Sequence, residues 1–438
     1  MAGWLRTLYT GLLHLLLPLV LLYLLVRCLR ERGYCAGWRQ RLGGGPGGIH
    51  RLRGEGAKAG PLWVHAASVG EVRAAAGLVR GLLRDHPERP VLVTTTTPTG
   101  ADQVAELFGR EVSHAYLPLD LPWAVAAFLR RWQPELAVIL EMEFWPNLYR
   151  AIAARRIPLL LANARLSARS AGRYRLLKPL VAATLGRIDR IAAQTGDDAE
   201  RLRDLGGEAL PITVTGSVKF DQAVPEDALN DGAALREELG GSERPVWIAA
   251  STREGEEELI LAAHERVCTR HPEALLILVP RHPQRFDKVA ALCRDSGMAM
   301  VRRSAGGAVR ATTRVYLGDT MGELPIYYAA ADVAFVGGSL VPTGGQNVLE
   351  PAALGRPVVL GPHDFNFSHI VRTLVAAGAA EQVADVRELA TVIDQLLDAP
   401  GRRERMARNG FDLITRNRGA TEQLLRQIDA LLNGTEGS

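Results

Sequence analysis

Cysteine is scarce in this chain, and the spacing of its four copies matches no common cysteine motif. They lie at Cys28, Cys35, Cys268 and Cys293 among 438 residues. No pair has C-x-x-C spacing, so the sequence indicates neither a disulfide framework nor a structural zinc site. We therefore expect the main body of the protein to reside in a reducing, cytosolic compartment.

Several motifs that bind nucleotides and metals are also missing. The chain has no D-x-D sequence, so we expect no divalent cation that holds a nucleotide diphosphate through that motif. It has no G-x-x-x-x-G-K-[ST] loop, which leaves ATP or GTP hydrolysis without support. No His/Cys cluster is spaced for a transition metal. We predict that the protein needs no metal and no cofactor.

One segment lacks acidic and basic side chains altogether. Residues 7–26 form 20 positions without Asp, Glu, Lys or Arg, and such a helix is about 30 Å long, enough to cross a hydrocarbon core. A cleaved signal peptide is the alternative, but its apolar region should be shorter and end in an A-x-A-like site. His14 and Pro18 leave open a tilted or interfacial helix. We predict an uncleaved membrane anchor over residues 1–27.

Basic residues dominate the stretch that follows. Between positions 27 and 58, eight Lys or Arg residues stand against two Glu. By the positive-inside rule, this excess places the body of the protein in the cytoplasm, and it would hold the chain against anionic headgroups. The patch G-G-G-P-G-G at 43–48 follows no strand pattern. Residues 28–60 are therefore expected to form a basic, glycine-rich linker.

The rest of the chain alternates short apolar runs with amphipathic helical patterns. Such runs are typical of parallel strands that are buried on both faces. The expected strands are 62–66, 91–95, 136–140, 158–162, 188–193, 246–250, 275–279, 314–317, 333–336 and 357–360. The length exceeds a single core. The sequence thus predicts an α/β protein with two doubly wound Rossmann-like domains facing a cleft, in which ligands bind at the carboxyl ends of the strands.

The domain boundaries follow from composition. A stretch rich in Pro, Asp, Asn and Gly at 224–241 is the expected interdomain linker. It separates an N-terminal domain at 61–223 from a C-terminal domain at 242–438, whose last helix is free to pack back on the first domain.

The first chemical cluster is W-V-H-A-A-S-V-G-E at 63–71, where a strand ends and a helix begins. A carboxylate at Glu71 would be kept ionised by the helix dipole, which suits a general base. Ser68 and Glu71 also have the S-x-x-E spacing of a capping box. Spacing alone favours the cap.

The second cluster is E-M-E-F-W-P-N at 141–147, directly after a strand. Glu141 and Glu143 lie on the same side of the strand if the strand continues. Two neighbouring carboxylates are costly unless polar or cationic groups compensate their charges. Alternatively, Glu143 caps the next helix and Glu141 pairs with an arginine. Lys219, in T-G-S-V-K-F-D at 215–221, is either solvated or neutralises a phosphate or a developing negative charge.

Strand ends in the second half carry chemistry that suits phosphate. Ser251 and Glu254 repeat the capping-box spacing after one strand. Arg281 follows another, and its guanidinium fork matches a phosphate, whereas His282 reads as a loop histidine. G-D-T-M-G-E at 318–323 opens a further helix.

Residues 337–362 read G-G-S-L-V-P-T-G-G-Q-N-V-L-E-P-A-A-L-G-R-P-V-V-L-G-P. Two glycine turns flank a helix signal that carries Glu350. This pattern predicts backbone N–H groups for a phosphate and a carboxylate for ribose hydroxyls. The alternative is an ordinary helix start with an acidic first turn.

One basic run is left over. From Arg150 to Lys178 there are eight basic residues and no acidic one. A solvated face usually explains such a run, but beside a membrane anchor a site for a phosphorylated lipid is an equal alternative. Aromatic residues are too few here to favour nucleic acid.

Eight ordered motifs carry a family resemblance over residues 1 to about 370. They are H-A-A-S-V-G-E, T-T-T-T-P-T-G at 94–100, E-M-E-F-W-P-N, N-A-R-L-S-A-R-S, G-S-V-K-F-D, V-P-R-H-P, M-G-E and G-G-Q-N-V-L-E-P. Together they resemble the 3-deoxy-D-manno-octulosonic acid (Kdo) transferases of lipid A assembly. Met142, Phe144 and Val218 depart from the family pattern, and these apolar changes bear on pocket shape.

The resemblance implies a GT-B glycosyltransferase at the bacterial inner membrane. It would move Kdo from CMP-Kdo to the lipid A precursor, with inversion at the anomeric carbon, and would bind no nucleic acid. Glu71 would be the base, and Glu141 and Lys219 would stabilise the transition state. The residues that the resemblance assigns to CMP are Pro280, Arg281, Met321, Gly322, Glu323, Asn347, Val348, Leu349 and Glu350. Another lipid-directed transferase with a UDP donor, or a sugar-nucleotide epimerase of the same fold, is the alternative.

Overall fold

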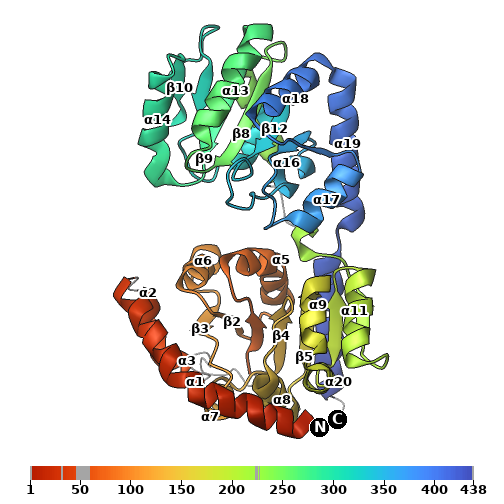
Figure 1. Cartoon of the computed structure of the whole chain (residues 1–438). Coiled ribbons are helices and arrows are strands. Elements are labelled where there is room, and N and C mark those ends of the chain that lie inside the picture. Colours follow the sequence, from red (N-terminus) through yellow and green to blue (C-terminus); the bar gives the residue numbers. More distant parts are fainter. Residues whose placement is uncertain (1, 31–32, 46–59, 222–224, 226, 437–438) are drawn as a thin grey trace. The chain divides into compact units, whose positions relative to one another are not determined.

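The computed structural model describes residues 2–30, 33–45, 60–221, 225 and 227–436, and the chain divides into two compact units (Figure 1). Unit 1 contains residues 1–222 and 417–438, and unit 2 contains residues 223–416. Each unit is built on its own parallel sheet of seven strands.

The sheet of unit 1 has the order β3-β2-β1-β4-β5-β6-β7. Its strands are β1 (Leu62–His65), β2 (Val91–Thr95), β3 (Ser113–Tyr116), β4 (Leu136–Leu140), β5 (Leu159–Ala164), β6 (Arg190–Ala193) and β7 (Ile212–Val214). The order reverses between β1 and β4. In a doubly wound sheet, this reversal opens a crevice at the carboxyl ends of the two strands.

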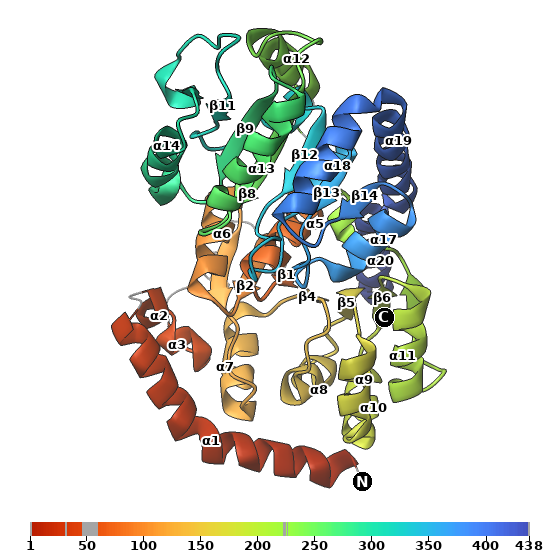
Figure 2. The same ribbon diagram turned by 45° about the horizontal axis from the view of Figure 1, so that its top comes forward.

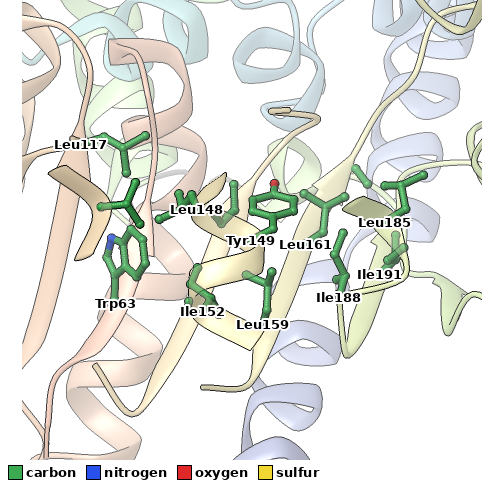
Figure 3. Packing of buried hydrophobic residues seen from close by; sticks show 14 of the residues in the cluster. Trp63, Leu117, Leu148, Tyr149, Ile152, Leu159, Leu161, Leu185, Ile188 and Ile191 are labelled. Carbon is green, nitrogen blue, oxygen red and sulfur yellow. The ribbon is translucent and has the colours of Figure 1, made fainter. Parts of the chain in front are cut away.

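Helices cover both faces of this sheet. They are α5 (Val69–Asp85), α6 (Pro98–Phe108), α7 (Pro122–Trp132), α8 (Pro146–Ala154), α9 (Ala168–Arg175), α10 (Lys178–Leu185), α11 (Gly196–Gly206) and α20 (Ala420–Glu436). One face buries Trp63, Leu148 and Ile188 among others (Figure 3). The other face is covered by α5, α6 and α20, and Leu424 and Ile428 of α20 are completely buried there. The last helix is thus part of the core of unit 1.

The N-terminal segment forms α1 (Ala2–Arg30), α2 (Gly33–Ala36) and α3 (Trp38–Arg41). Figure 2 shows α1 as a long helix at the edge of unit 1, where it contacts α8 and α10. Tyr9 donates to Asp120 Oδ2 at 3.0 Å, and Thr10 donates to Asn147 Oδ1 at 3.1 Å. Residues 3–29 form the single helix in the described chain that is long and apolar enough to cross a membrane. The hydrogen bonds of Tyr9 and Thr10 nevertheless tie this helix to the rest of unit 1.

Two expectations for this segment need correction. A disulfide joins Cys28 to Cys35, although their spacing gave no disulfide signal; the end of α1 and the following α2 bring them together. Part of the expected linker at 28–60 is also ordered, because Arg41 of α3 donates to the Thr96 carbonyl at 2.7 Å and stacks on the Tyr116 ring at 4.5 Å. Residues 46–59 lie outside the described chain.

The sheet of unit 2 has the order β10-β11-β9-β8-β12-β13-β14. Its strands are β8 (Val246–Thr252), β9 (Leu275–Pro280), β10 (Met300–Arg302), β11 (Val315–Leu317), β12 (Val333–Val336), β13 (Val358–Leu360) and β14 (Ala380–Gln382). Its helices are α12 (Ala228–Glu238), α13 (Glu257–Arg270), α14 (Phe286–Asp295), α15 (Leu324–Ala330), α16 (Leu349–Ala353), α17 (Ser368–Ala376), α18 (Val386–Asp398) and α19 (Pro400–Asn417). Here the order reverses between β8 and β12.

The expected linker at 224–241 is largely helical. It contains α12, which packs against α15 so closely that a Cβ on Gly232 would lie 2.3 Å from Cβ of Ala329. Unit 2 therefore begins at residue 223, and the chain returns to unit 1 at residue 417. The polar composition suggested a linker because one face of α12 is exposed to solvent.

Candidate active site

The crevice of unit 1 lies where β1 and β4 end side by side. These strands are paired in register, with His65 opposite Ile139. The residues that follow them, 66–71 and 141–147, therefore meet at one edge of the sheet. Both segments were expected from the sequence to carry chemistry.

Glu71 lies in the first turn of α5, and its N–H donates to Oγ of the N-cap residue Ser68 at 3.4 Å, so that one half of the expected capping box forms. Its Oε2 accepts from the Ala67 N–H and its Oε1 from the Ser68 hydroxyl, each at 2.8 Å. Burial raises the pKa of the Glu71 carboxyl above its ordinary value. The two hydrogen bonds oppose this shift, while the charges of Glu141 and Glu143 add to it. A role in helix capping does not exclude a role as a base, because the capping contacts orient a carboxylate whose pKa is raised.

Glu141 does not continue the strand, contrary to the alternation argument. Its φ is +59°, a left-handed conformation that L-residues adopt rarely, and it turns the chain directly after β4. Lys219, in the short helix η1 (Val218–Asp221), has its Nζ 3.3 Å from Glu141 Oε1. The partner is thus this lysine rather than an arginine. The structure brings both predicted residues together on unit 1.

Glu143 has a separate partner that the sequence did not suggest. Its Oε2 lies 2.7 Å from His65 Nε2 and accepts from Trp145 Nε1 at 2.9 Å. The contact with His65 Nε2 is close, but its geometry is not that of a regular hydrogen bond. Burial opposes ionisation of Glu143, but the contacts with His65 and Trp145 prevail and lower its pKa. Glu143 does not cap α8, whose N-cap residue is Trp145.

The other ring nitrogen of His65 also has a partner. His65 is fully buried, and its Nδ1 lies 2.8 Å from Thr94 Oγ1, which also accepts from Trp63 Nε1 at 2.8 Å. The sequence places His65 at the end of a strand, but only the pairing of β1 with β4 shows that this strand end lies beside the E-M-E motif. In the described part of the chain, no group of three or more His, Cys, Asp or Glu residues is placed to hold a metal ion.

In unit 2, most residues assigned to CMP follow β9, β11 and β12. Pro280 ends β9 and Arg281 comes next. The Met321 side chain is 64 % exposed and Gly322 has φ of +85°. Glu323 is held by Arg303 Nη2 at 2.8 Å and by the Tyr327 hydroxyl at 2.9 Å. Its carboxylate is thus occupied within the protein.

The residues after β12 divide into two pairs. Asn347 Nδ2 donates to Glu350 Oε1 at 3.0 Å, and Asn347 Oδ1 accepts from the Leu349 N–H at 3.1 Å. These polar groups are partly exposed. Val348 and Leu349 are buried at 1 % and 3 % exposure, so their side chains serve the core.

The first glycine turn of this segment does not offer its N–H groups to a phosphate. Glu256, which is fully buried, accepts from the backbone N–H of Gly338 at 2.6 Å, Ser339 at 3.0 Å and Leu340 at 2.9 Å. This corrects the expectation for residues 337–340, because a protein carboxylate occupies the anion position. The expected capping box of Ser251 and Glu254 is also absent, since α13 begins later, at Glu257.

Comparisons with known proteins identify the family of the chain. The family model of 3-deoxy-D-manno-octulosonic-acid transferase (kdotransferase) matches residues 36–222, and the model of glycosyl transferases group 1 matches residues 303–412. The chain is 41 % identical over 423 residues to a 3-deoxy-D-manno-octulosonic acid transferase of Haemophilus influenzae, covering 96 % of this chain and 97 % of that one. It is 42 % identical over 439 residues to a protein of the same name from Bordetella pertussis, covering 97 % and 98 %.

Among solved structures, a UDP-N-acetylglucosamine 2-epimerase shares the fold, with a TM-score of 0.54 at 16 % identity over 85 % of this chain and 97 % of that one. Two parallel seven-stranded sheets, each with one reversal of strand order, make this a GT-B type architecture. With near-complete relatives above 40 % identity, the chain belongs to the 3-deoxy-D-manno-octulosonic acid transferase family and is a glycosyltransferase.

Proposed function

We propose that this enzyme transfers Kdo from CMP-Kdo to the phosphorylated lipid A precursor, lipid IVA, in lipopolysaccharide biosynthesis. The acceptor oxygen forms a bond to the anomeric carbon, the bond from that carbon to the phosphate oxygen breaks, and CMP leaves with the bonding electrons. Attack from the face opposite CMP inverts the anomeric carbon. The proton of the acceptor hydroxyl goes to Glu71.

The observation that carries this proposal is that three neighbouring carboxylates of unit 1 have different partners. Glu141 is paired with Lys219 at 3.3 Å and Glu143 with His65 at 2.7 Å. Glu71 accepts two hydrogen bonds but has no cationic partner among the residues that the structure describes, and its pKa is raised by burial and by the charges of Glu141 and Glu143. A general base works best with a pKa closer to neutrality. Glu71 fits that role better than its two neighbours.

Lys219 supplies positive charge where negative charge develops. We propose that this lysine takes the place of a metal ion, so that transfer needs no divalent cation and no cofactor. The leaving CMP would be held on unit 2 by Arg281, the backbone of 321–323, and the Asn347–Glu350 pair.

We propose that α1 holds the enzyme at the bacterial inner membrane, with both units on the cytoplasmic side. Its large exposed side chains include Leu8 at 60 %, Leu15 at 75 % and Leu19 at 62 % exposure. The hydrogen bonds of Tyr9 and Thr10 to unit 1 favour a helix that lies in the membrane interface over one that spans the bilayer, because a spanning helix would leave these groups in hydrocarbon.

The test is incubation of the full chain with tetra-acylated, bisphosphorylated lipid A precursor and either CMP-Kdo made in situ or UDP-sugars, with and without a chelator. We expect Kdo-bearing lipid from CMP-Kdo alone, and equally with chelator. Product from a UDP donor would support the alternative transferase. Epimerised UDP-sugar without lipid acceptor would support the epimerase.

A further inference from the structure

The carboxyl edge of unit 2 carries one arginine that neither the motifs nor the proposed donor contacts use. Arg253 directly follows β8, at the reversal of strand order between β8 and β12. Its side chain lies beside the glycine turn after β12, since a Cβ on Gly338 would be 3.4 Å from Arg253 Cγ. Ligands of doubly wound sheets bind at this position.

Arg253 has no carboxylate partner among the described residues, although three glutamates follow it. Glu254 pairs with Lys288, and Glu257 pairs with Arg285. Glu256 accepts backbone N–H groups, including that of Arg253 at 3.1 Å. The guanidinium instead donates through Nη1 to His282 Nε2 at 2.6 Å, and its buried Nε has no hydrogen-bond partner.

The histidine cannot neutralise this charge. Because Arg253 donates to Nε2, His282 is neutral at that nitrogen. Burial lowers the pKa of His282, and the charges of Arg253, Arg281 and Arg285 lower it further. His282 thus orients the guanidinium and leaves its positive charge for an anion from outside the protein.

A second cation stands next to Arg253. Thr252 and Pro280 are paired across β8 and β9, and the Arg281 N–H donates to the Thr252 carbonyl at 3.1 Å. Arg253 and Arg281 therefore follow paired positions on adjacent strands. A glycosyl nucleotide of a 2-ulosonic acid carries two anionic groups on one carbon, because its carboxylate and its phosphate are both attached to the anomeric carbon.

We propose that Arg253, oriented by His282, binds the carboxylate of the donor sugar, while Arg281 faces the phosphate. This inference rests on the proposed function and deepens it, because it names the group that distinguishes an ulosonic acid donor from UDP-hexoses. A guanidinium fork matches a planar carboxylate with two parallel hydrogen bonds.

The test compares the whole donor with CMP, which lacks the carboxylate. For wild type, Arg253→Gln, Arg253→Lys and the control Arg294→Gln on exposed α14, we would measure kcat/KM for CMP-Kdo made in situ and Kd for CMP by calorimetry. We expect Arg253→Gln to lose about 10- to 100-fold in kcat/KM, as for a charged hydrogen bond, and to bind CMP like wild type. Arg253→Lys should lie between the two, because it keeps the charge and loses the fork.

Equal weakening of donor and CMP would assign Arg253 to the phosphate and overturn the proposal, as would an unchanged kcat/KM. If Arg253→Gln fails to fold, it loses CMP binding, and Arg253→Lys then decides: wild-type kcat/KM for that variant contradicts carboxylate recognition. A wild-type enzyme that binds CMP but does not use CMP-Kdo would instead contradict the proposed function.

Discussion

His65 Nε2 lies 2.7 Å from Glu143 Oε2, and this pair joins the ends of β1 and β4 at the reversal of the unit 1 sheet. The contact fixes the loop after β4, in which Glu141 also turns toward Lys219. It separates the roles of three acidic residues that the sequence presents in two short motifs. Positioned by this pair, Glu143 influences Glu71 through its charge.

The pH dependence of turnover should report this influence. The charge of Glu143 contributes to raising the pKa of Glu71, and a base is lost as the pH falls through its pKa. In Glu143→Gln, the Glu71 pKa should fall, and the acid limb of the kcat/KM profile should move to lower pH. Glu208→Gln, on an exposed loop, is the control and should leave the limb in place. A limb that moves upward or stays fixed in Glu143→Gln would argue against this coupling.

The Glu141–Lys219 pair should behave as a unit. Each of Glu141→Gln and Lys219→Met should reduce kcat by about 10²-fold, typical of removing one preorganised electrostatic group. Because the two groups contact each other at 3.3 Å, the double variant should be less impaired than the product of the single effects. A double-mutant cycle on kcat measures this coupling. Strict multiplicativity would show that the two residues act independently.

The pH dependence of stability should reveal how α1 is attached. Burial raises the pKa of Asp120 to about 6, from 3.8, despite hydrogen bonds from Asn147, Leu148 and Tyr9. A carboxyl with a raised pKa stabilises the fold fully below its unfolded pKa, and this contribution is lost as the pH rises through about 6. The unfolding free energy of wild type relative to Asp120→Asn should therefore fall by about 2 kcal/mol between pH 4 and pH 7. Urea unfolding in detergent measures it, and a pH-independent difference would contradict the buried carboxyl.

The packing of α12 on α15 predicts a size limit at Gly232. A methyl group there would lie 2.3 Å from Ala329 Cβ and 3.1 Å from the Ile326 carbonyl oxygen. Gly232→Ala should destabilise the protein by about 1–3 kcal/mol, as overpacking does. Gly172→Ala in α9, which has open space around the new Cβ, should be neutral or stabilising by up to about 1 kcal/mol. Equal stability of the two variants in thermal unfolding would place α12 in a linker rather than in unit 2.

The central strands could be predicted from the sequence because they are buried on both faces and therefore read as apolar runs. β2, β4 and β12 begin and end at the expected residues. The strands β3, β7, β10 and β14 were missed because they are the edge strands of the two sheets, where polar side chains are allowed and the apolar run is interrupted.

Part of the candidate site could also be predicted from the sequence. Motifs after β1 and β4 identified Glu71 and Glu141 because strand ends meet at one edge. The partners of the carboxylates were hidden, since they depend on a three-dimensional register. His65 looked like one more strand residue, and Glu256 gave no sign that it would occupy the glycine turn at 338–340.

The most direct test of the account is the rate of Kdo transfer by Glu71→Gln, with CMP affinity measured on the same preparation. The substitution keeps the size of the side chain and removes its basicity. We predict a loss of about 10²–10⁴-fold in kcat with an unchanged Kd for CMP. A Glu71→Gln enzyme that transfers Kdo to the lipid acceptor at the wild-type rate would contradict the assignment of Glu71 as the base.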